Sequence, residues 1–198
     1  MATITAIYGS PRREGNTSLL LKQAVAGARD GGALVEEIVL RDYKIAPCLE
    51  IYNCIHHGEC AIHDDFPEIL TKIIASSGIM LASPIFFYTV SAHTKIFMDR
   101  CQSLWVKKYW IEKQPFNDPK LTRDGLFISA GATKGAKLFN GALLTVKYFF
   151  DVLDTRLSQK LLYRELDHKG DVARFPEYLR EAYDAGREMA GKLRERDK

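Results

Sequence analysis

The sequence predicts an α/β fold built around a parallel β-sheet. Short apolar runs alternate with longer helical patterns from one end of the chain to the other, and this alternation is typical of successive βαβ units. One run, residues 79–83 (IMLAS), is apolar enough to be buried on both faces, as a central parallel strand must be. The runs predict five strands, at residues 3–8, 34–40, 79–83, 125–130 and about 157–163.

The helices between the strands follow from apolar periodicity and from residues that begin or end helices. Apolar residues recur on one face of a helix predicted near residues 18–29. Gly31 and Gly32 come next, and glycine readily takes the left-handed conformation that ends a helix. The last helix is predicted at about residues 176–196, because a proline suits its first turn.

Two insertions interrupt this pattern. Residues 42–65 hold three of the four cysteines, and residues 104–121 hold both tryptophans. Loops this long inside a compact domain are usually functional. At the end of the first insertion, Asp65 followed by Glu68 predicts a capping box and therefore the start of a helix.

The composition is that of an ordinary globular protein. Of the 198 residues, 46% are hydrophobic and 27% are charged, which excludes disordered, collagen-like and coiled-coil chains. The 28 basic and 25 acidic residues leave a net charge of +3, too small to predict a nucleic-acid partner. No segment has the apolar pattern of a signal peptide or a membrane span. We therefore expect one domain over residues 1–198, with no membrane partner, in the cytoplasm.

A hydroxyl-rich loop follows the first predicted strand. Residues 10–18 (SPRREGNTS) place hydroxyls and free backbone N–H groups in the positive field of a helix N-terminus. Such a loop suits a phosphate group, with Arg12 to neutralise part of its charge. The loop lacks the G-x-G-x-x-G pattern of dinucleotide sites and the Gly-Lys-Ser/Thr ending of nucleotide P-loops. The alternative is that Asn16 or Thr17 serves as an ordinary N-cap.

An aromatic loop follows the third predicted strand. Ligands of open parallel sheets bind outside the carboxyl ends of the strands, and residues 83–91 (SPIFFYTVS) lie there. Phe86, Phe87 and Tyr88 offer aromatic surface to a planar ring. The alternative is an aromatic patch that belongs to the core.

Taken together, the two loops resemble a known family. The residues that carry the resemblance are Gly9-Ser10-Pro11-Arg12 with Gly15-Asn16-Thr17, then Ser83-Pro84-Ile85-Phe86-Phe87 with Ser91-Ala92-x-x-Lys95 and Asp99-Arg100. In this order and spacing they are similar to the NADPH-dependent FMN reductase family of flavodoxin-like proteins, and especially to its iron-sulfur flavoprotein branch. The resemblance covers residues 1 to about 135.

The resemblance implies a doubly wound, five-stranded parallel sheet in the flavodoxin order 2-1-3-4-5, with FMN at its carboxyl edge. The phosphate loop of the family corresponds to Ser10, Arg12, Asn16, Thr17 and Ser18. The loop that contacts the isoalloxazine ring corresponds to Pro84, Ile85, Phe86 and Phe87. A third contact, at the pyrimidine edge of the ring, falls on the loop after the fourth strand and on its residues Ala130, Gly131 and Thr133. No catalytic side chain is implied.

The first insertion also resembles the iron-sulfur branch. Cys48, Cys54 and Cys60 are evenly spaced, and thiolates so close together suggest a metal or a cluster. The branch reads Cys-x-x-Cys-x-x-Cys-x5-Cys, whereas this chain has Ile51 where the second cysteine belongs. Three thiolates could hold a cluster with one open iron, or bind zinc with a neighbouring histidine. The simpler interpretation, which we adopt as the expectation, is a loop that persists without metal or iron-sulfur cluster.

The family resemblance implies flavin chemistry, in which FMN carries out hydride and electron transfer. The first interpretation is an FMN-dependent NAD(P)H oxidoreductase that passes electrons to a quinone, an azo or nitro compound, a metal ion or a protein. The alternative is an electron-transfer flavoprotein that exchanges electrons with protein partners without NAD(P)H. The charge of +3 disfavours a strongly acidic flavodoxin-type carrier. Similar family members often pair, so we expect a homodimer or homotetramer, with residues 104–121 as a subunit contact or lid.

Overall fold

A five-stranded parallel sheet forms the centre of the molecule. The computed structural model describes residues 1–116 and 123–196. The strands are β1 (Thr3–Tyr8), β2 (Leu34–Val39), β3 (Gly78–Pro84), β4 (Arg123–Ala130) and β5 (Thr155–Tyr163). They pair in the order β2-β1-β3-β4-β5, each pair parallel. The predicted strand number, direction and order are therefore confirmed, with strand ends displaced by one or two residues.

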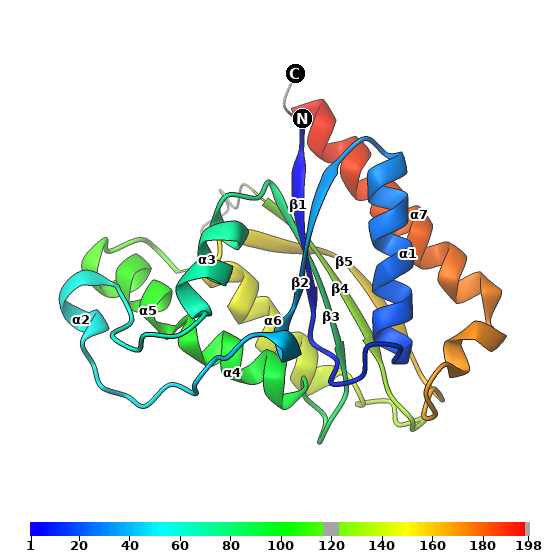
Figure 1. Ribbon diagram of the computed structural model, residues 1–198, viewed down its shortest axis with the longest axis horizontal. Helices are drawn as coiled ribbons and strands as arrows, with labels where there is room; N and C mark the ends of the chain where they lie inside the picture. The colour runs from blue at the N-terminus through cyan, green and yellow to red at the C-terminus, as the bar shows by residue number, and fades with distance from the viewer. Residues whose placement is uncertain (117–122, 197–198) are drawn as a thin grey trace.

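Helices cover both faces of the sheet (Figure 1). One face carries α1 (Asn16–Asp30) and α7 (Pro176–Arg196), and the other carries α3 (Phe66–Ile74), α4 (Ala92–Arg100) and α6 (Asn140–Val152). The central strands are buried on both faces because neighbouring apolar residues point to opposite sides. In β3, Met80 packs in the core with α1 and α7, whereas Leu81 packs in the core with α3, α4 and α6.

The remaining helical elements are short. They are η1 (Leu40–Asp42), α2 (Cys54–His57), α5 (Gln102–Trp105), the π-helix η2 (Val106–Ile111) and η3 (Asp171–Arg174). Residues 104–111 of the second predicted insertion thus form a helical extension after α4 rather than a loop. Residues 117–121 of that insertion lie outside the described residues. None of the described helices combines the length and the apolar character needed to cross a membrane.

Two helix ends differ in detail from the prediction. Gly32 has a φ of +86° and takes the left-handed conformation after α1, whereas Gly31 stays right-handed. At the start of α3, the predicted capping box of Asp65 is wrong. Asp65 occupies the N-cap position without a side-chain cap bond, and its carboxylate instead accepts from Lys44 N at 2.7 Å. The neighbouring Asp64 accepts from Phe66 N at 3.0 Å. The side chain that bonds the first N–H of α3 therefore belongs to Asp64, the residue before Asp65.

Candidate functional site

The loops after β1, β3 and β4 meet at the carboxyl edge of the sheet around a small cavity of about 130 Å³. The lining residues come from these three loops and from the segment after β5: Ser10, Pro11, Arg12, Gly15, Asn16, Thr17, Pro84, Ile85, Phe86, Ala130, Gly131, Ala132, Leu166 and Asp167. Parallel strands bring their carboxyl ends to one edge, so loops far apart in sequence become neighbours. Nine of the twelve residues that the sequence singled out line this cavity, and Ser18, Phe87 and Thr133 do not.

The loop after β1 is folded tightly upon itself. The hydroxyl of Ser10 accepts a hydrogen bond from Arg12 N at 3.1 Å, and Gly15 N donates to Arg12 O at 3.1 Å. A Cβ at Gly15 would lie 2.9 Å from Ser10 Oγ and 3.2 Å from Arg12 O. Only glycine fits this turn without displacing the loop, and the turn leads directly into the first residues of α1.

Thr17 carries the most informative side chain of the site. Its hydroxyl is buried and has no hydrogen-bond partner among the described residues. It lies in the first turn of α1, which contains no acidic side chain to occupy the free N–H groups. A buried hydroxyl without a partner is energetically costly, and the N-terminus of a helix attracts anions. A buried donor hydroxyl in the first turn of a helix is a group that the oxygen of a phosphate would satisfy.

Two other residues of this loop use their side chains elsewhere. Asn16 donates to His168 O at 3.0 Å and accepts from Val172 N at 3.1 Å. The hydroxyl of Ser18 donates to Arg12 O at 3.0 Å. Asn16 therefore ties the start of α1 to the segment after β5, and Ser18 holds the shape of the loop. Of the five residues predicted for phosphate binding, these two shape the site rather than present free side-chain donors.

The loop after β3 divides its aromatic residues between the cavity and solvent. Pro84, Ile85 and Phe86 line the cavity, and Phe86 is 49% exposed. Phe87 is 100% exposed and lies outside the cavity lining. Phe86 and Thr89 exchange backbone hydrogen bonds of 2.9 and 3.1 Å, closing a two-residue turn in which Phe87 and Tyr88 have φ values of +49° and +63°.

The loop after β4 contributes backbone rather than side chains. Ala130, Gly131 and Ala132 line the cavity, whereas Thr133 does not. Gly131 N donates to Tyr163 O at 3.0 Å, so this N–H is already engaged. Leu166 and Asp167, which the sequence reasoning missed, complete the wall. They follow β5, and the rule that ligands bind beyond strand carboxyl ends could have found them.

A set of buried hydroxyls joins these loops beneath the cavity. The hydroxyl of Ser91, the N-cap of α4, donates to Gly9 O. Ser91 N donates to Ser83 Oγ at 2.9 Å, and Ser129 Oγ donates to Ser83 O at 2.8 Å. Because each of these buried groups is paired, the network fixes the ends of β1, β3 and β4 relative to one another. Sequence reasoning did not identify this network.

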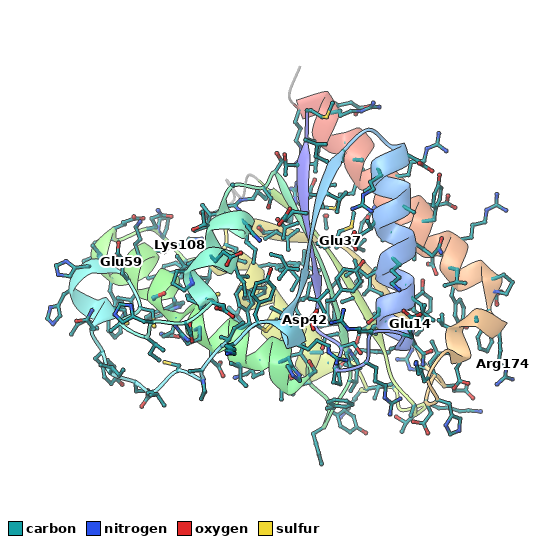
Figure 2. All side chains as sticks on the ribbon, in the orientation of Figure 1. Glu14, Glu37, Asp42, Glu59, Lys108 and Arg174 are labelled. Carbon is teal, nitrogen blue, oxygen red and sulfur yellow. The ribbon has the colours of Figure 1, made fainter. Side chains whose placement is uncertain are left out.

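A second, larger cavity of about 660 Å³ lies beside the cysteine segment. Cys48, Cys54 and Cys60, all free and half-buried, line it together with Ile51. Burial raises the pKa of the Cys54 thiol, and the neighbouring Cys60 and Cys48 raise it further. α2 projects at the end of the molecule away from the loop after β1 (Figure 1). Figure 2 likewise shows Glu59, directly after α2, far from Glu14 of that loop.

The predicted alternative of a single zinc ion finds no support in the geometry. Across residues 1–116 and 123–196, no three histidine, cysteine, aspartate or glutamate side chains are arranged to hold one metal ion. The histidines of this segment are likewise absent from the residues that line the cavity.

Comparison with known sequences places the chain among flavoproteins. The family model for NADPH-dependent FMN reductases matches residues 2–160. An iron-sulfur flavoprotein of Methanocaldococcus jannaschii is 43% identical over 101 residues, which are 51% of this chain and 52% of that protein. The match therefore spans about half the length of this relative.

Solved structures support the fold. A flavone reductase superposes with a TM-score of 0.72 at 19% identity, covering 98% of this chain and 64% of that chain. A flavodoxin from the domain Archaea reaches a TM-score of 0.57 at 15% identity, covering 98% of this chain and 99% of that chain. At these identities the likeness shows the flavodoxin-like fold alone. Because the family model extends over residues 2–160, the chain belongs to the NADPH-dependent FMN reductase family.

Proposed function

We propose that this protein binds FMN at the cavity between the loops after β1, β3 and β4, and that it is an NAD(P)H-dependent oxidoreductase. Electrons would pass through the bound flavin to a small acceptor, such as a quinone, an azo or nitro compound or a metal ion, or to a protein. Membership of the family supports FMN-dependent oxidoreduction. We propose both the electron donor and the electron acceptor on this basis.

The unpartnered hydroxyl of Thr17 is the observation that carries this proposal. The hydroxyl is buried at the N-terminus of α1, Thr17 lines the cavity, and a terminal phosphate would satisfy the hydroxyl. The exposed Arg12 lies on the same cavity and carries positive charge toward a dianion. The residues present thus fit the phosphate of FMN.

The size of the cavity indicates how the rest of the cofactor would lie. Its volume of about 130 Å³ is below the roughly 300–1,000 Å³ typical of pockets that enclose a whole ligand. We infer that the cavity takes the phosphate and the ribityl chain, and that the isoalloxazine ring lies along the open rim beside Pro84, Ile85 and the half-exposed Phe86. A ring at the rim remains accessible to a nicotinamide and to an acceptor.

When bound, FMN supplies the hydride and electron transfer, and the protein orients the ring and adjusts its electronic character. Because Gly131 N is engaged with Tyr163 O, we assign the polar contacts of the pyrimidine edge to the next backbone N–H groups, at Ala132 and Thr133. Such donors favour negative charge on the ring edge.

Anaerobic reduction tests the proposal. Purified protein loaded with FMN is mixed with NADPH or NADH, and the visible absorbance of the flavin is followed. We expect bleaching within seconds by at least one nicotinamide, followed by reoxidation when a quinone is added. The same protein carrying Thr17→Val should bind less FMN but reduce whatever FMN it retains. A flavin that stays oxidised with both nicotinamides contradicts the NAD(P)H-dependent activity.

A second function has one specific observation in its favour. The relative from Methanocaldococcus jannaschii is named an iron-sulfur flavoprotein, a name that suggests electron exchange between redox groups and protein partners. In that case the bound flavin would be reduced by a reduced protein carrier such as a ferredoxin, and not by a nicotinamide. The anaerobic experiment distinguishes the two functions when dithionite-reduced ferredoxin is used as a third donor.

We also propose that the protein works as a homodimer or homotetramer. An exposed apolar surface, defined here as Phe87, Tyr88, Leu144 and Tyr148, joins the loop after β3 to α6, and Ala142 N donates to Tyr88 O at 3.1 Å. Exposed aromatic clusters of this kind are typical of subunit contacts. Light scattering should give a multiple of the chain mass, and Tyr148→Glu should lower it.

A further inference from the structure

A relative of this chain is named for an iron-sulfur cluster, and this name directs attention to the cysteine segment, residues 46–64. We propose that this segment is a cluster cradle in which one ligand position has become apolar. Cys48, Cys54 and Cys60 keep three positions, and Ile51 occupies the fourth. The protein as it exists therefore retains no four-iron cluster, and Ile51 is the residue that decides this.

The four residues border the same cavity, as the ligands of one cluster would. Cys48, Cys54, Cys60 and Ile51 all line the cavity of about 660 Å³. The cysteines are half-buried, and Ile51 is 58% exposed. An isoleucine that lines a cavity yet stays mostly exposed adds little to a hydrophobic core. Ile51 therefore borders the same cavity as the three thiols.

A zinc ion and a four-iron cluster place different demands on a set of thiolates. A single zinc ion draws all its thiolates to about 2.3 Å from one point. In a four-iron cluster each thiolate binds a different iron, so the sulfur atoms stay apart around a common space. In the part of the chain that the structure describes, no three ligand side chains converge on one ion, yet three cysteines border one cavity.

The backbone on both sides of Ile51 takes the left-handed conformation. Glu50 and Tyr52, on either side of Ile51, have φ values of +50° and +61°. Left-handed residues other than glycine are uncommon and persist where the surroundings require them. Alternation of right- and left-handed residues turns backbone N–H groups inward, as in many phosphate and iron-sulfur sites. This strained backbone remains although one thiol is missing.

Contacts at the base of the segment explain why it stays folded without a metal. The buried Arg100 donates to Ala46 O at 3.0 Å and to Ile62 O at 3.2 Å, and it pairs with Asp64. At the far end, the left-handed Gly58 packs against η2, where an added Cβ would lie 2.7 Å from Lys107 Cβ. The segment is thus anchored at both ends and along one side, and a substitution at the exposed Ile51 leaves these anchors intact.

The missing ligand explains the loss of the cluster. With three thiolates, one iron of a bound cluster would have no protein ligand. Leu49 and Tyr52, which flank this side of the cavity, are 64% and 55% exposed, so water and oxygen reach it. An iron that is exposed and without a thiolate is released or oxidised, and the rest of the cluster follows.

The test is a gain of cofactor by one substitution. The wild-type protein and Ile51→Cys are treated anaerobically with iron(III), a dithiol reductant and sulfide, desalted and assayed for iron, acid-labile sulfide and broad visible absorption beyond that of the flavin. We expect close to one four-iron cluster per chain in Ile51→Cys and little in the wild type. The control Ile55→Cys adds a thiol in the same segment, on an exposed residue outside the cavity lining, and should stay without cluster.

Each possible result either supports or overturns the proposal. A wild-type protein that retains close to one cluster per chain overturns the proposal, and so does a folded Ile51→Cys that gains none. Thermal unfolding verifies the fold of each variant, and Ile51→His, which supplies a nitrogen ligand, is the second variant if Ile51→Cys is unstable. Adding Cys54→Ser to Ile51→Cys should abolish the gain. Because FMN content is measured separately, failure here leaves the proposed flavin function untouched.

Discussion

Arg100 and Asp64 form a buried ion pair that closes the base of the cysteine segment. The two side chains are 0% and 11% exposed, and the Arg100 guanidinium also stacks over the ring of Phe66, 4.7 Å from its centroid. Asp64 accepts further hydrogen bonds from Ala46 N at 2.9 Å and from Phe66 N at 3.0 Å. One carboxylate therefore ties α4, the start of α3 and the beginning of the cysteine segment together.

The first prediction is that Asp64→Asn lowers the free energy of unfolding by about 3–5 kcal/mol at pH 7, because it leaves the buried guanidinium of Arg100 without its partner charge. Chemical denaturation of the purified protein measures this loss. Lys95→Gln, which removes an exposed ion pair with Asp99, is the matched control and should cost no more than about 1 kcal/mol.

The pH dependence of the same pair has a defined sign. Burial alone raises the pKa of Asp64, but hydrogen bonds from Arg100, Ala46 N and Phe66 N outweigh it and hold that pKa below its usual value. The contribution of Asp64 to stability is therefore complete above the unfolded pKa of about 3.9 and is lost as the pH falls through the lower folded value. Asp64→Asn should show a smaller loss of stability below about pH 4 than the wild type. Equal acid sensitivity of the two proteins would contradict this assignment.

The second prediction concerns the hydroxyl of Thr17. Thr17→Val keeps the shape of the side chain and removes the donor that we assign to the FMN phosphate. A hydrogen bond to a charged group contributes about 1.5–3 kcal/mol, so the Kd for FMN should rise roughly tenfold to hundredfold. The Kd for riboflavin, which has no phosphate, should change little. Fluorescence titration measures both constants, and equal losses for the two flavins would exclude the phosphate assignment.

The third prediction separates Asn16 from its neighbour Thr17. Asn16→Ala removes the hydrogen bonds to His168 O and Val172 N and leaves the buried Val172 N unpaired. We expect it to cost about 1–3 kcal/mol of stability, a fall in Tm of roughly 2–4 °C per kcal/mol for a protein of this size. The ratio of FMN to riboflavin affinity should be retained. A changed ratio with an unchanged Tm would show instead that Asn16 contacts the phosphate.

The fourth prediction is that Phe86→Ala weakens FMN binding. Packing of a ring on an aromatic face contributes about 0.5–1.5 kcal/mol beyond the burial of area, so the Kd should rise roughly threefold to tenfold. Because Phe86 is half exposed, the apo protein should keep its melting temperature. A strongly destabilised apo protein with unchanged intrinsic affinity would assign Phe86 to the core.

The fifth prediction is that Phe87→Asn stabilises the protein. Phe87 is fully exposed and left-handed, and a left-handed conformation costs most residues about 1–2 kcal/mol, whereas asparagine tolerates it. We expect a gain of about 1 kcal/mol in dilute solution, measured by thermal unfolding, with no change in the affinity of one chain for FMN. A loss of stability at high concentration, where subunits associate, would identify Phe87 as a subunit contact.

The local pattern of the sequence was sufficient for the sheet. Residues 79–82 are apolar without interruption, and their burial on both faces follows from that alone. The loops after β1, β3 and β4 could be placed at one edge because parallel strands share the direction of their carboxyl ends. That these loops form one flavin site was predicted from resemblance to a family. The match over residues 2–160 confirms the family.

The tertiary structure alone decided which side chains are free and which are already bonded. Asn16 and Thr17 are adjacent and similar in polarity, yet Val172, 156 residues away, engages the first and leaves the second unpartnered. Phe86 and Phe87 are identical residues, and a two-residue turn directs one toward the cavity and the other to solvent. Strand and helix periods depend on short-range alternation of polar and apolar residues, which a sequence displays. Hydrogen-bond partners depend on distances that exist only after distant segments have packed.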